Sequence, residues 1–191
     1  MEKPDVRQVT DSRVLAAMAH PLRRRLMDVF KVHGPSTVGM LADRTDQAPA
    51  NVSHHLKVLA AADLVTEAPE LARDRRERWW QLASRTVRWS TTDFDTDPAD
   101  RAVADAATSL NLDRHVALAR AWHAAEETEQ AVWGNGPFSL DRWMHLTPAE
   151  LEELSSEIVA VLTRWGDREL PDDGAERQPV FVFAHGVPAR P

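Results

Sequence analysis

The sequence predicts a mainly α-helical protein with a small amount of β structure. Apolar residues recur at the helical period in several segments, and two of these segments are joined by only a few polar residues. Immediately afterwards, β-branched and aromatic runs flank a charged turn. These observations predict a winged helix-turn-helix domain, followed by a helical region that contains a short β-hairpin-like pair of strands.

Composition limits the classes of protein that the chain can belong to. Its 191 residues suit two small domains, which we expect at residues 1–90 and 91–191. The absence of cysteine excludes disulfides and thiolate metal sites. No apolar run is long enough to cross a membrane, and residues 1–5 do not resemble a signal peptide. We therefore expect a cytoplasmic protein that has no membrane partner.

Charge is divided unequally between the two halves. Residues 1–90 contain 15 Lys and Arg against 11 Asp and Glu, a balance of +4. Residues 91–191 contain 8 and 19, a balance of −11, and together these give the formal net charge of −7. A basic half joined to an acidic half indicates that only the first half meets a polyanion such as nucleic acid.

The first helices are predicted from capping residues. Residues 1–9 are polar, and we expect them to be loose. Thr10 or Asp11 can cap a short helix that ends near Ala19, and Pro21 suits the first turn of the next helix. The run Arg23 to Arg25 in that helix is either a solvated face or a contact to a nucleic-acid backbone.

The segment Thr37 to Ala61 predicts the helix-turn-helix itself. Thr37 caps a helix that ends near Arg44, and a second helix runs from about Pro49 to Ala61. Its inward stripe is formed by Val52, Leu56 and Leu59. At about 100° per residue, Ala50, His54 and Lys57 then point outward, with Asn51 and Ser53 on the flanks.

Short polar side chains near a helix N-terminus suit base edges and phosphates in the major groove of duplex DNA. His55 lies at the edge of the apolar stripe, so it is either a packed histidine or a phosphate contact. The wing is predicted from Leu64–Ala68, a charged tip and Trp79–Leu82, with one of Trp79 and Trp80 facing inward. The candidate DNA-binding residues are Asn51, Ser53, His54, His55, Lys57, Arg73, Arg75, Arg76 and Arg78.

About the first ninety residues resemble the ArsR-like winged-helix transcriptional regulators. The matching segments are Ala19–Arg23, Val52–Leu59, Asp63–Val65 and Arg76–Leu82. The resemblance implies a homodimeric, cytoplasmic DNA-binding regulator. Two residues depart from the family pattern, because Asp63 and Arg75 stand where the family usually has glycine. A left-handed turn at Asp63 is less favourable than at glycine, and the wing can be longer or differently turned.

The second half predicts a long helix, a break and another helix. Asp97 can cap a helix over residues 98–132, whose broad apolar surface of small and large residues is a candidate dimer interface or an intramolecular core. The break at 134–137 is followed by possible strands at 138–146 and 180–183. Thr147 and Glu150 have capping-box spacing and open a helix that runs to about Trp165.

Some members of the resembled family bind metal through an Asp-x-His pair and a later His-x-x-Glu/His pair on the helix after the wing. The corresponding residues here are Asp113, His115, His123 and Glu126. The two pairs are three residues closer than the family spacing, which turns the second pair by ~300° around a helix. A metal-responsive repressor is therefore the weaker alternative, and we expect no cofactor.

Tryptophan is abundant, with seven residues and no tyrosine. Large aromatic side chains either fill a core or line a pocket for an apolar or aromatic ligand. The candidate effector-binding residues are Trp122, Trp133, Trp143 and Trp165. No phosphate-binding glycine loop or nucleophile elbow is present, and the chain is not expected to be an enzyme.

The sequence therefore predicts a sequence-specific DNA-binding repressor that acts as a homodimer. Release by a small organic effector is an alternative that the sequence leaves open. A winged-helix module for protein–protein contact, without DNA binding, is the main rival.

Overall fold

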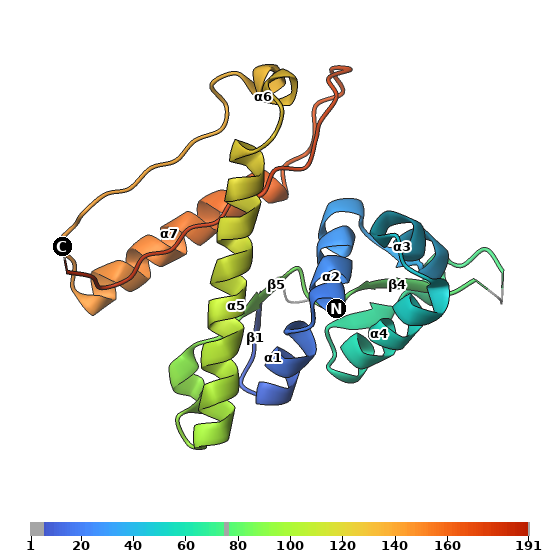
Figure 1. Ribbon diagram of the computed structural model, residues 1–191, viewed down its shortest axis with the longest axis horizontal. Helices are drawn as coiled ribbons and strands as arrows, with labels where there is room; N and C mark the ends of the chain where they lie inside the picture. The colour runs from blue at the N-terminus through green and yellow to red at the C-terminus, as the bar shows by residue number, and fades with distance from the viewer. Residues whose placement is uncertain (1–5, 75–76, 191) are drawn as a thin grey trace. The chain divides into compact units, whose positions relative to one another are not determined.

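The computed structural model describes residues 6–74 and 77–190. The chain forms two compact units, Met1–Arg114 and His115–Pro191, and each is described by itself. The helices and strands are labelled in Figure 1. None of the described helices is both long and apolar enough to span a membrane.

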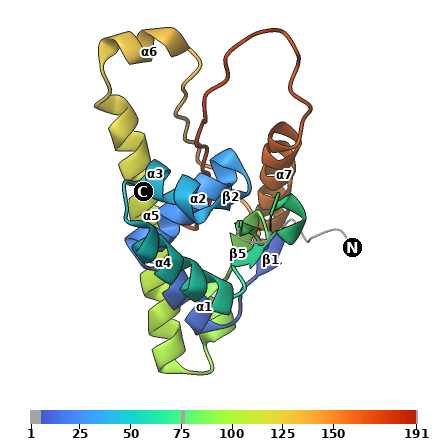
Figure 2. The same cartoon turned by 90° about the vertical axis from the view of Figure 1, so that its right-hand side faces the viewer.

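The first unit is built around four helices and a three-stranded sheet (Figures 1 and 2). The helices are α1 (Ser12–Met18), α2 (Pro21–His33), α3 (Val38–Thr45) and α4 (Pro49–Ala61). The sheet has the order β2-β4-β3, from β2 (Ser36–Thr37), β4 (Trp79–Leu82) and β3 (Val65–Glu67). Both pairings are antiparallel, with Val65 opposite Leu82 and Ser36 opposite Trp80.

A second, two-stranded sheet was not expected from the sequence. Strand β1 (Val6–Gln8) pairs in parallel with β5 (Thr86–Arg88), with Arg7 opposite Val87. The prediction that residues 1–9 are loose is therefore wrong for residues 6–9. Val9, which follows β1, is only 2% exposed and belongs to the core, so this segment is held by packing as well as by hydrogen bonds.

Local capping explains where the helices begin. The Asp11 carboxylate accepts from the N–H of Arg13 at the start of α1, and the His20 Nδ1 accepts from the N–H of Leu22 at the start of α2. At the start of α3 the Thr37 hydroxyl accepts from the N–H of Met40. These caps replace hydrogen bonds that a first helical turn cannot make internally.

The core of the first unit joins all of these helices. Leu15, Leu26, Leu41, Leu56 and Leu59 are fully buried. The apolar face of α1 faces this core, since Val14, Leu15 and Met18 are all buried. The core also takes up Phe94 from the short 3-10 helix η2 (Thr91–Phe94), and Ala104 and Ala107 from α5 (Pro98–His123).

Helix α5 begins as predicted but is shorter. The Asp97 carboxylate accepts from the N–H of Ala99 at 2.8 Å. The helix ends at His123, and a separate helix α6 (Glu127–Trp133) follows, so the single helix predicted over 98–132 is wrong. The Gln130 side chain donates to the carbonyl oxygens of Ala125 and Trp122, which stabilises the end of α5.

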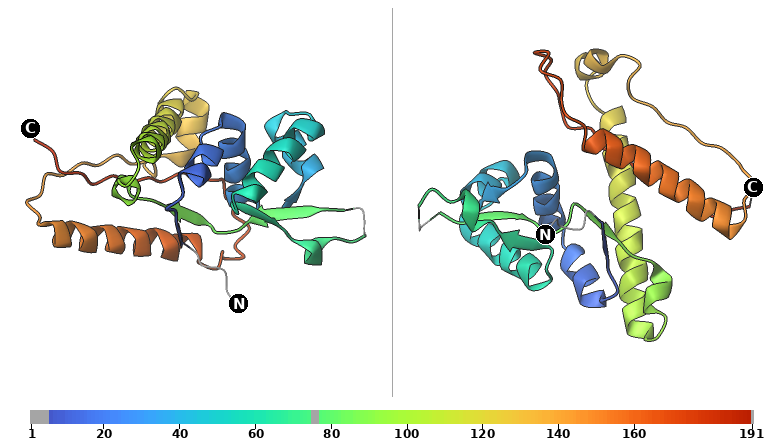
Figure 3. Two further views of the ribbon diagram at one scale, coloured as in Figure 1. Left: turned by 90° about the horizontal axis from the view of Figure 1, so that it is seen from below. Right: turned by 180° about the vertical axis from the view of Figure 1, so that it is seen from behind.

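The second unit contains α6 and α7 (Pro148–Gly166), which Figure 3 shows from two sides. Thr147 and Glu150 form the capping box that the sequence predicts: the Thr147 hydroxyl accepts from the N–H of Glu150, whose carboxylate accepts from the N–H of Thr147. These hydrogen bonds lower the pKa of Glu150.

The predicted strand pair at 138–146 and 180–183 is wrong, because neither segment is a strand. An isolated pair of strands is marginal without a third strand or a packed face. Phe181 and Phe183 instead lie beside the His115 ring, with centroid distances of 5.3 and 5.1 Å.

Candidate nucleic-acid interface

Helices α3 and α4 form a helix-turn-helix, and the backbone conformation and a hydrogen bond at the end of α3 fix its turn. Asp46, at the C-terminus of α3, has a left-handed backbone with φ 54°. The N–H of Gln47 donates to the carbonyl oxygen of Ala42, which closes the turn. Helix α4 then begins at Pro49, whose missing N–H is not needed in a first turn.

Helix α4 has the buried and exposed faces that its periodicity predicts. Val52, Leu56 and Leu59 are 0% exposed, so the helix cannot rotate without disrupting the core. The opposite face is open to solvent and carries Ala50, Asn51, His54 and Lys57, with Ser53 half-buried. Helix α4 has no side-chain cap at Ala48, but Pro49 carries no N–H, and the N–H groups of Asn51 and Val52 donate to the carbonyl oxygen of Ala48.

Asn51 is oriented by a residue that the sequence analysis did not single out. Its Nδ2 donates to the Oε1 of Gln47 at 2.9 Å, and the Gln47 amide nitrogen donates to the carbonyl oxygen of Asp46 at 2.8 Å. In the sequence, the only indication of this contact is that Gln47 and Asn51 are four residues apart across the start of α4. Gln47 therefore belongs to the same polar surface as Asn51.

His55 does not belong to that surface, so its prediction as a DNA contact is corrected. It is 8% exposed, and its ring lies 4.4 Å from that of His20 and 5.3 Å from that of His54. Its Nδ1 is buried with no hydrogen-bond partner among the described residues. Burial lowers the pKa of His55, and the neighbouring His20, Arg23 and His54 lower it further. The mostly buried ring of His55 therefore packs against its neighbours, in agreement with the packed-histidine interpretation.

The C-terminus of α4 is held by the N-terminal strand. The Arg7 guanidinium donates to the carbonyl oxygens of Ala62 and Asp63, at 3.1 and 2.5 Å. Asp63 has φ 53°, so this residue takes the left-handed conformation that the family pattern assigns to glycine. Arg7 was missed because its partners are 55 and 56 residues away, and no local pattern shows such a contact.

The wing is a long connection between β3 and β4 that includes the 3-10 helix η1 (Pro69–Leu71). Figure 3 shows this hairpin extending away from the helices. Arg73 and Arg78 are exposed, and Arg78 lies 3.7 Å from the Glu67 carboxylate. Arg75 and Arg76, two further predicted contacts, lie outside the described residues.

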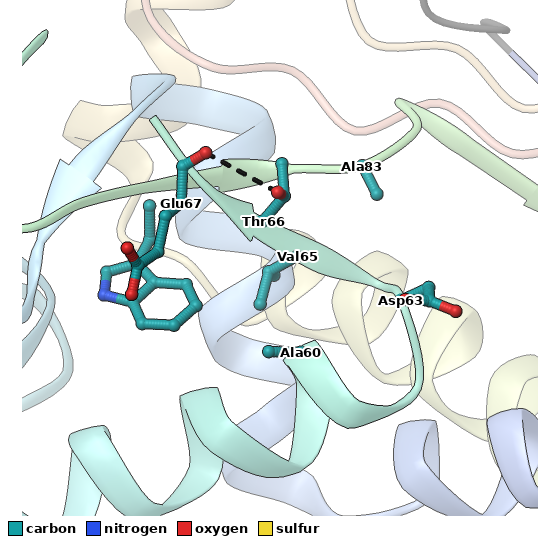
Figure 4. A pocket seen from close by; sticks show the side chains of 7 residues that line it. Ala60, Asp63, Val65, Thr66, Glu67 and Ala83 are labelled. Carbon is teal, nitrogen blue, oxygen red and sulfur yellow. Dashed lines mark hydrogen bonds between the residues drawn. The ribbon is translucent and has the colours of Figure 1, made fainter. Parts of the chain in front are cut away.

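Trp79 and Trp80 are both half-buried, and Trp80 packs against the core. Trp80 also lines a shallow hollow beside the end of α4, with Ala60, Asp63, Val65, Thr66, Glu67 and Ala83 (Figure 4). Two carboxylates at this hollow give it an acidic rather than a phosphate-binding character.

Two arginines of the run Arg23 to Arg25 form hydrogen bonds within the first unit. The Arg23 guanidinium donates to the carbonyl oxygens of Ala17 and Ala16, and Arg24 donates to the Asn111 side chain at 2.9 Å. Arg25 is exposed, with one long contact to the carbonyl oxygen of Arg44. The run therefore ties α2 to α1 and α5, which neither interpretation from the sequence anticipated.

The alternative metal ligands are not brought together. Among the described residues, no three His, Asp or Glu side chains have a geometry that would hold a metal ion. Of the four candidates, Asp113, His115, His123 and Glu126, only His115 has a notable ring contact. Its Nδ1 lies 3.2 Å from the Nε2 of His185, in the second unit.

The candidate effector residues are similarly dispersed. Trp122 and Trp133 are half-buried, whereas Trp143 and Trp165 are 64% and 58% exposed. Within the described part of the chain, no ring contact joins any two of the four indoles. Trp165 instead lies against the Arg168 guanidinium, 4.6 Å from its ring centroid.

Comparison with known proteins agrees with this geometry. Residues 18–68 match the family model described as a helix-turn-helix domain. A solved possible transcriptional regulator for arsenical resistance is 31% identical, over 55% of this chain and 94% of that chain, with a TM-score of 0.33. The N-terminal domain is an ArsR-like winged helix-turn-helix domain.

Other solved structures similar to this ArsR-like domain are more distant. Reduced HlyU from Vibrio cholerae is 23% identical over 39% of this chain and 74% of that chain, with a TM-score of 0.34. A homodimeric winged helix-turn-helix DNA-binding domain from Mycobacterium bovis, a possible ArsR-family regulator, is 20% identical over 60% and 83%, with a TM-score of 0.36. No curated protein matches the chain. The family and fold are those of DNA-binding transcriptional regulators and not of enzymes.

Proposed function

We propose that the protein is a sequence-specific repressor that binds duplex DNA as a homodimer, with α4 in the major groove and the wing beside it. The observation that carries this proposal is the polar, exposed face of α4 opposite a fully buried apolar stripe. A repressor needs no further activity, because a bound dimer excludes other proteins from the same stretch of DNA. Such a helix presents side chains to base edges while the domain holds it rigidly.

Within this interface the exposed residues have different roles. Lys57 has no ion-pair partner among the described residues, so its ammonium is available for a DNA phosphate. Asn51 is held by Gln47 near the helix N-terminus, where an amide can pair with adenine. His54 and Ser53 flank it, and Arg73 and Arg78 in the wing contact the backbone.

The dimer is proposed to form through α5. Ala102, Ala106 and Leu110 are exposed and follow one another at four-residue spacing, next to the stripe that packs inward through Ala104 and Ala107. Small residues at this spacing let two helices approach closely. Helix α1 is not part of this proposed contact, because its apolar face is buried in its own domain. An organic effector bound by the four tryptophans stays a prediction from the sequence, which the geometry does not strengthen.

The decisive experiment is fluorescence anisotropy with DNA from the upstream region of the protein's own gene, in a salt series. Lys57→Ala should weaken binding to all sequences and reduce the slope of log K against log salt by about 0.9, as expected for one lost phosphate contact. Asn51→Ala should instead reduce discrimination between operator and mutated sites by about 1–3 kcal/mol. Arg142→Ala, which removes an exposed charge from the acidic unit, is the matched control and should change neither quantity.

Failure of the wild type to bind genomic fragments even at low salt would overturn the proposal and favour a protein-binding role for the winged helix. The dimer is tested separately, because Leu110→Asp places a charge in the proposed α5 contact. Light scattering should then report a weakened dimer, while a wild type that is monomeric at micromolar concentration would contradict homodimerisation.

A further inference from the structure

Helix α7 carries an apolar seam with the spacing of a coiled coil. Leu151, Leu154, Ile158, Val161 and Trp165 are separated by three, four, three and four residues. This alternation spans two heptads of the pattern in which two helices wrap around each other, and an ordinary amphipathic helix has the same spacing. No charged residue interrupts the seam over its length.

The seam is largely uncovered by its own chain. Ile158 is 37% exposed, Val161 43% and Trp165 58%. Only the N-terminal end is partly covered, where Gly186 approaches so closely that a Cβ there would lie 3.3 Å from the Leu151 Cδ1. Exposed apolar helix faces of this regularity are stable in water only when another surface covers them.

The rest of the second unit also exposes apolar side chains to solvent. No residue between 115 and 190 is buried, although 18 large apolar side chains from Leu118 to Val187 are exposed. Apolar side chains exposed in this number mark a surface that another molecule covers.

We infer that α7 pairs with α7 of a second copy of this chain along the seam from Leu151 to Trp165. This inference rests on the proposed homodimer and assigns it a second contact besides α5. A self-complementary surface is what a two-fold dimer needs, because each copy presents the same residues. A single helix that carries a complete heptad seam meets this requirement without any other partner.

The charged residues beside the seam allow two copies of α7 to pair without repulsion. The flanking heptad positions hold Glu150, Glu157 and Arg164 on one side, and Ser155 and Leu162 on the other. In a parallel pair one side meets the other, so each glutamate faces an uncharged residue and no two carboxylates meet. A membrane surface is disfavoured, since helices that lie on membranes carry Lys and Arg on their polar face, whereas this one carries glutamates.

The absence of cysteine allows a direct test by cross-linking. Ile158 is midway between Leu151 and Trp165, so it faces its own copy whether the two helices run parallel or antiparallel. Ile158→Cys should therefore form a covalent dimer under mild oxidation. Ser156→Cys is the matched control, because Ser156 is exposed and lies on the opposite face of α7.

Two thiols held in one interface have an effective concentration near millimolar. At micromolar protein, the Ile158→Cys variant should therefore form the covalent dimer readily, with little or none from the Ser156→Cys variant, whose thiols point away from the partner helix. Equal rates for the two variants, or no covalent dimer from Ile158→Cys, would overturn the inference. A second variant, Val161→Asp, should weaken the dimer in light scattering while the circular dichroism of the winged-helix domain is retained, and an unchanged dimer would also overturn it.

The same samples separate this inference from the proposed function. If the wild type binds DNA as a dimer but Ile158→Cys does not cross-link, the seam is wrong and the proposed function stands. If Ile158→Cys cross-links but no DNA is bound, the seam is right and the DNA-binding proposal fails.

Discussion

The two units of this chain differ in how their apolar residues are used. In the first unit, leucines from four helices are fully buried and fix the orientation of α4. In the second unit, α7 has comparable amphipathic patterning, yet none of its residues is buried. The difference shows that a helical pattern predicts a helix in both units, whereas a core requires several elements that converge. The first unit therefore holds a rigid surface, and the second exposes a surface that a further copy can cover.

The strongest test of this comparison is a pair of leucine truncations. Leu56→Ala in α4, at 0% exposure, should cost about 2–5 kcal/mol of unfolding free energy because it leaves a cavity in a close-packed core. Leu140→Ala in the second unit, at 78% exposure, should change it by less than about 0.5 kcal/mol. Urea denaturation of both variants measures the difference. Similar losses would show that the second unit has a core of its own.

This contrast also explains what the sequence could predict. The bounds of α4 and the capping box of Thr147 and Glu150 were predicted correctly, because the signals lie within a few residues of each other. The pairing of β1 with β5 was missed, since each strand has three residues and its partner lies about 80 residues away. No pattern within either strand indicates the other, and the packing of Val9 becomes apparent only in the folded unit.

The candidate interface shows the same limit at the level of single side chains. The exposed positions of His54 and Lys57 follow from helix geometry alone, and the structure agrees. The sequence did not distinguish two roles for His55, because residues that are distant in the sequence determine whether a side chain at the edge of an apolar stripe is buried. Here the neighbour is His20, from the start of α2, which covers the ring. The wing contacts Arg75 and Arg76 lie outside the described residues and stay predictions.

The next largest loss of stability is expected on substitution of Arg7, whose side chain links strand β1 to the end of α4. Arg7→Ala removes a charged donor from the carbonyl oxygens of Ala62 and Asp63 at the end of α4. The loss should be roughly 1–2 kcal/mol, since the group is only partly buried. Arg13→Ala is the control, because its ion pair with Asp11 is exposed to solvent and should contribute little to stability. Thermal unfolding of both variants distinguishes a structural Arg7 from a surface charge.

A pH dependence is expected from the first unit, where His55 is buried beside other basic side chains. Burial, followed by His20, Arg23 and His54, lowers the pKa of His55 in the folded state below the value of about 6.5 in the unfolded chain. The unfolded state therefore binds the proton more tightly, so stability is complete above about pH 6.5 and is lost as the pH falls below it. The melting temperature should decrease between pH 7.5 and pH 5.5.

His55→Gln should reduce this pH dependence, because the buried titrating group is gone. His33→Gln, at an exposed histidine at the end of α2, is the control and should keep the wild-type slope. An unchanged slope in His55→Gln would show that other groups are responsible for the acid sensitivity.

The smallest effect concerns backbone conformation, and it sharpens the comparison of the two units. Left-handed positions in the first unit include Asp46 and Asp63, whereas those described in the second unit are Gly134 and Gly174. A side chain in this conformation costs energy. Asp46 and Asp63 are exposed, and backbone hydrogen bonds at the ends of α3 and α4 hold the turns in which they lie. Asp63→Gly should therefore raise the unfolding free energy by about 0.5–1 kcal/mol, less the entropy that glycine adds to the unfolded chain. Asp43→Gly, inside α3, should instead lower it by a few tenths of a kcal/mol, because glycine is the poorer helix former. If Asp63→Gly destabilised the domain as Asp43→Gly does, the aspartate would be contributing interactions that outweigh its backbone strain, and the departure from the family's glycine would be a stabilising one.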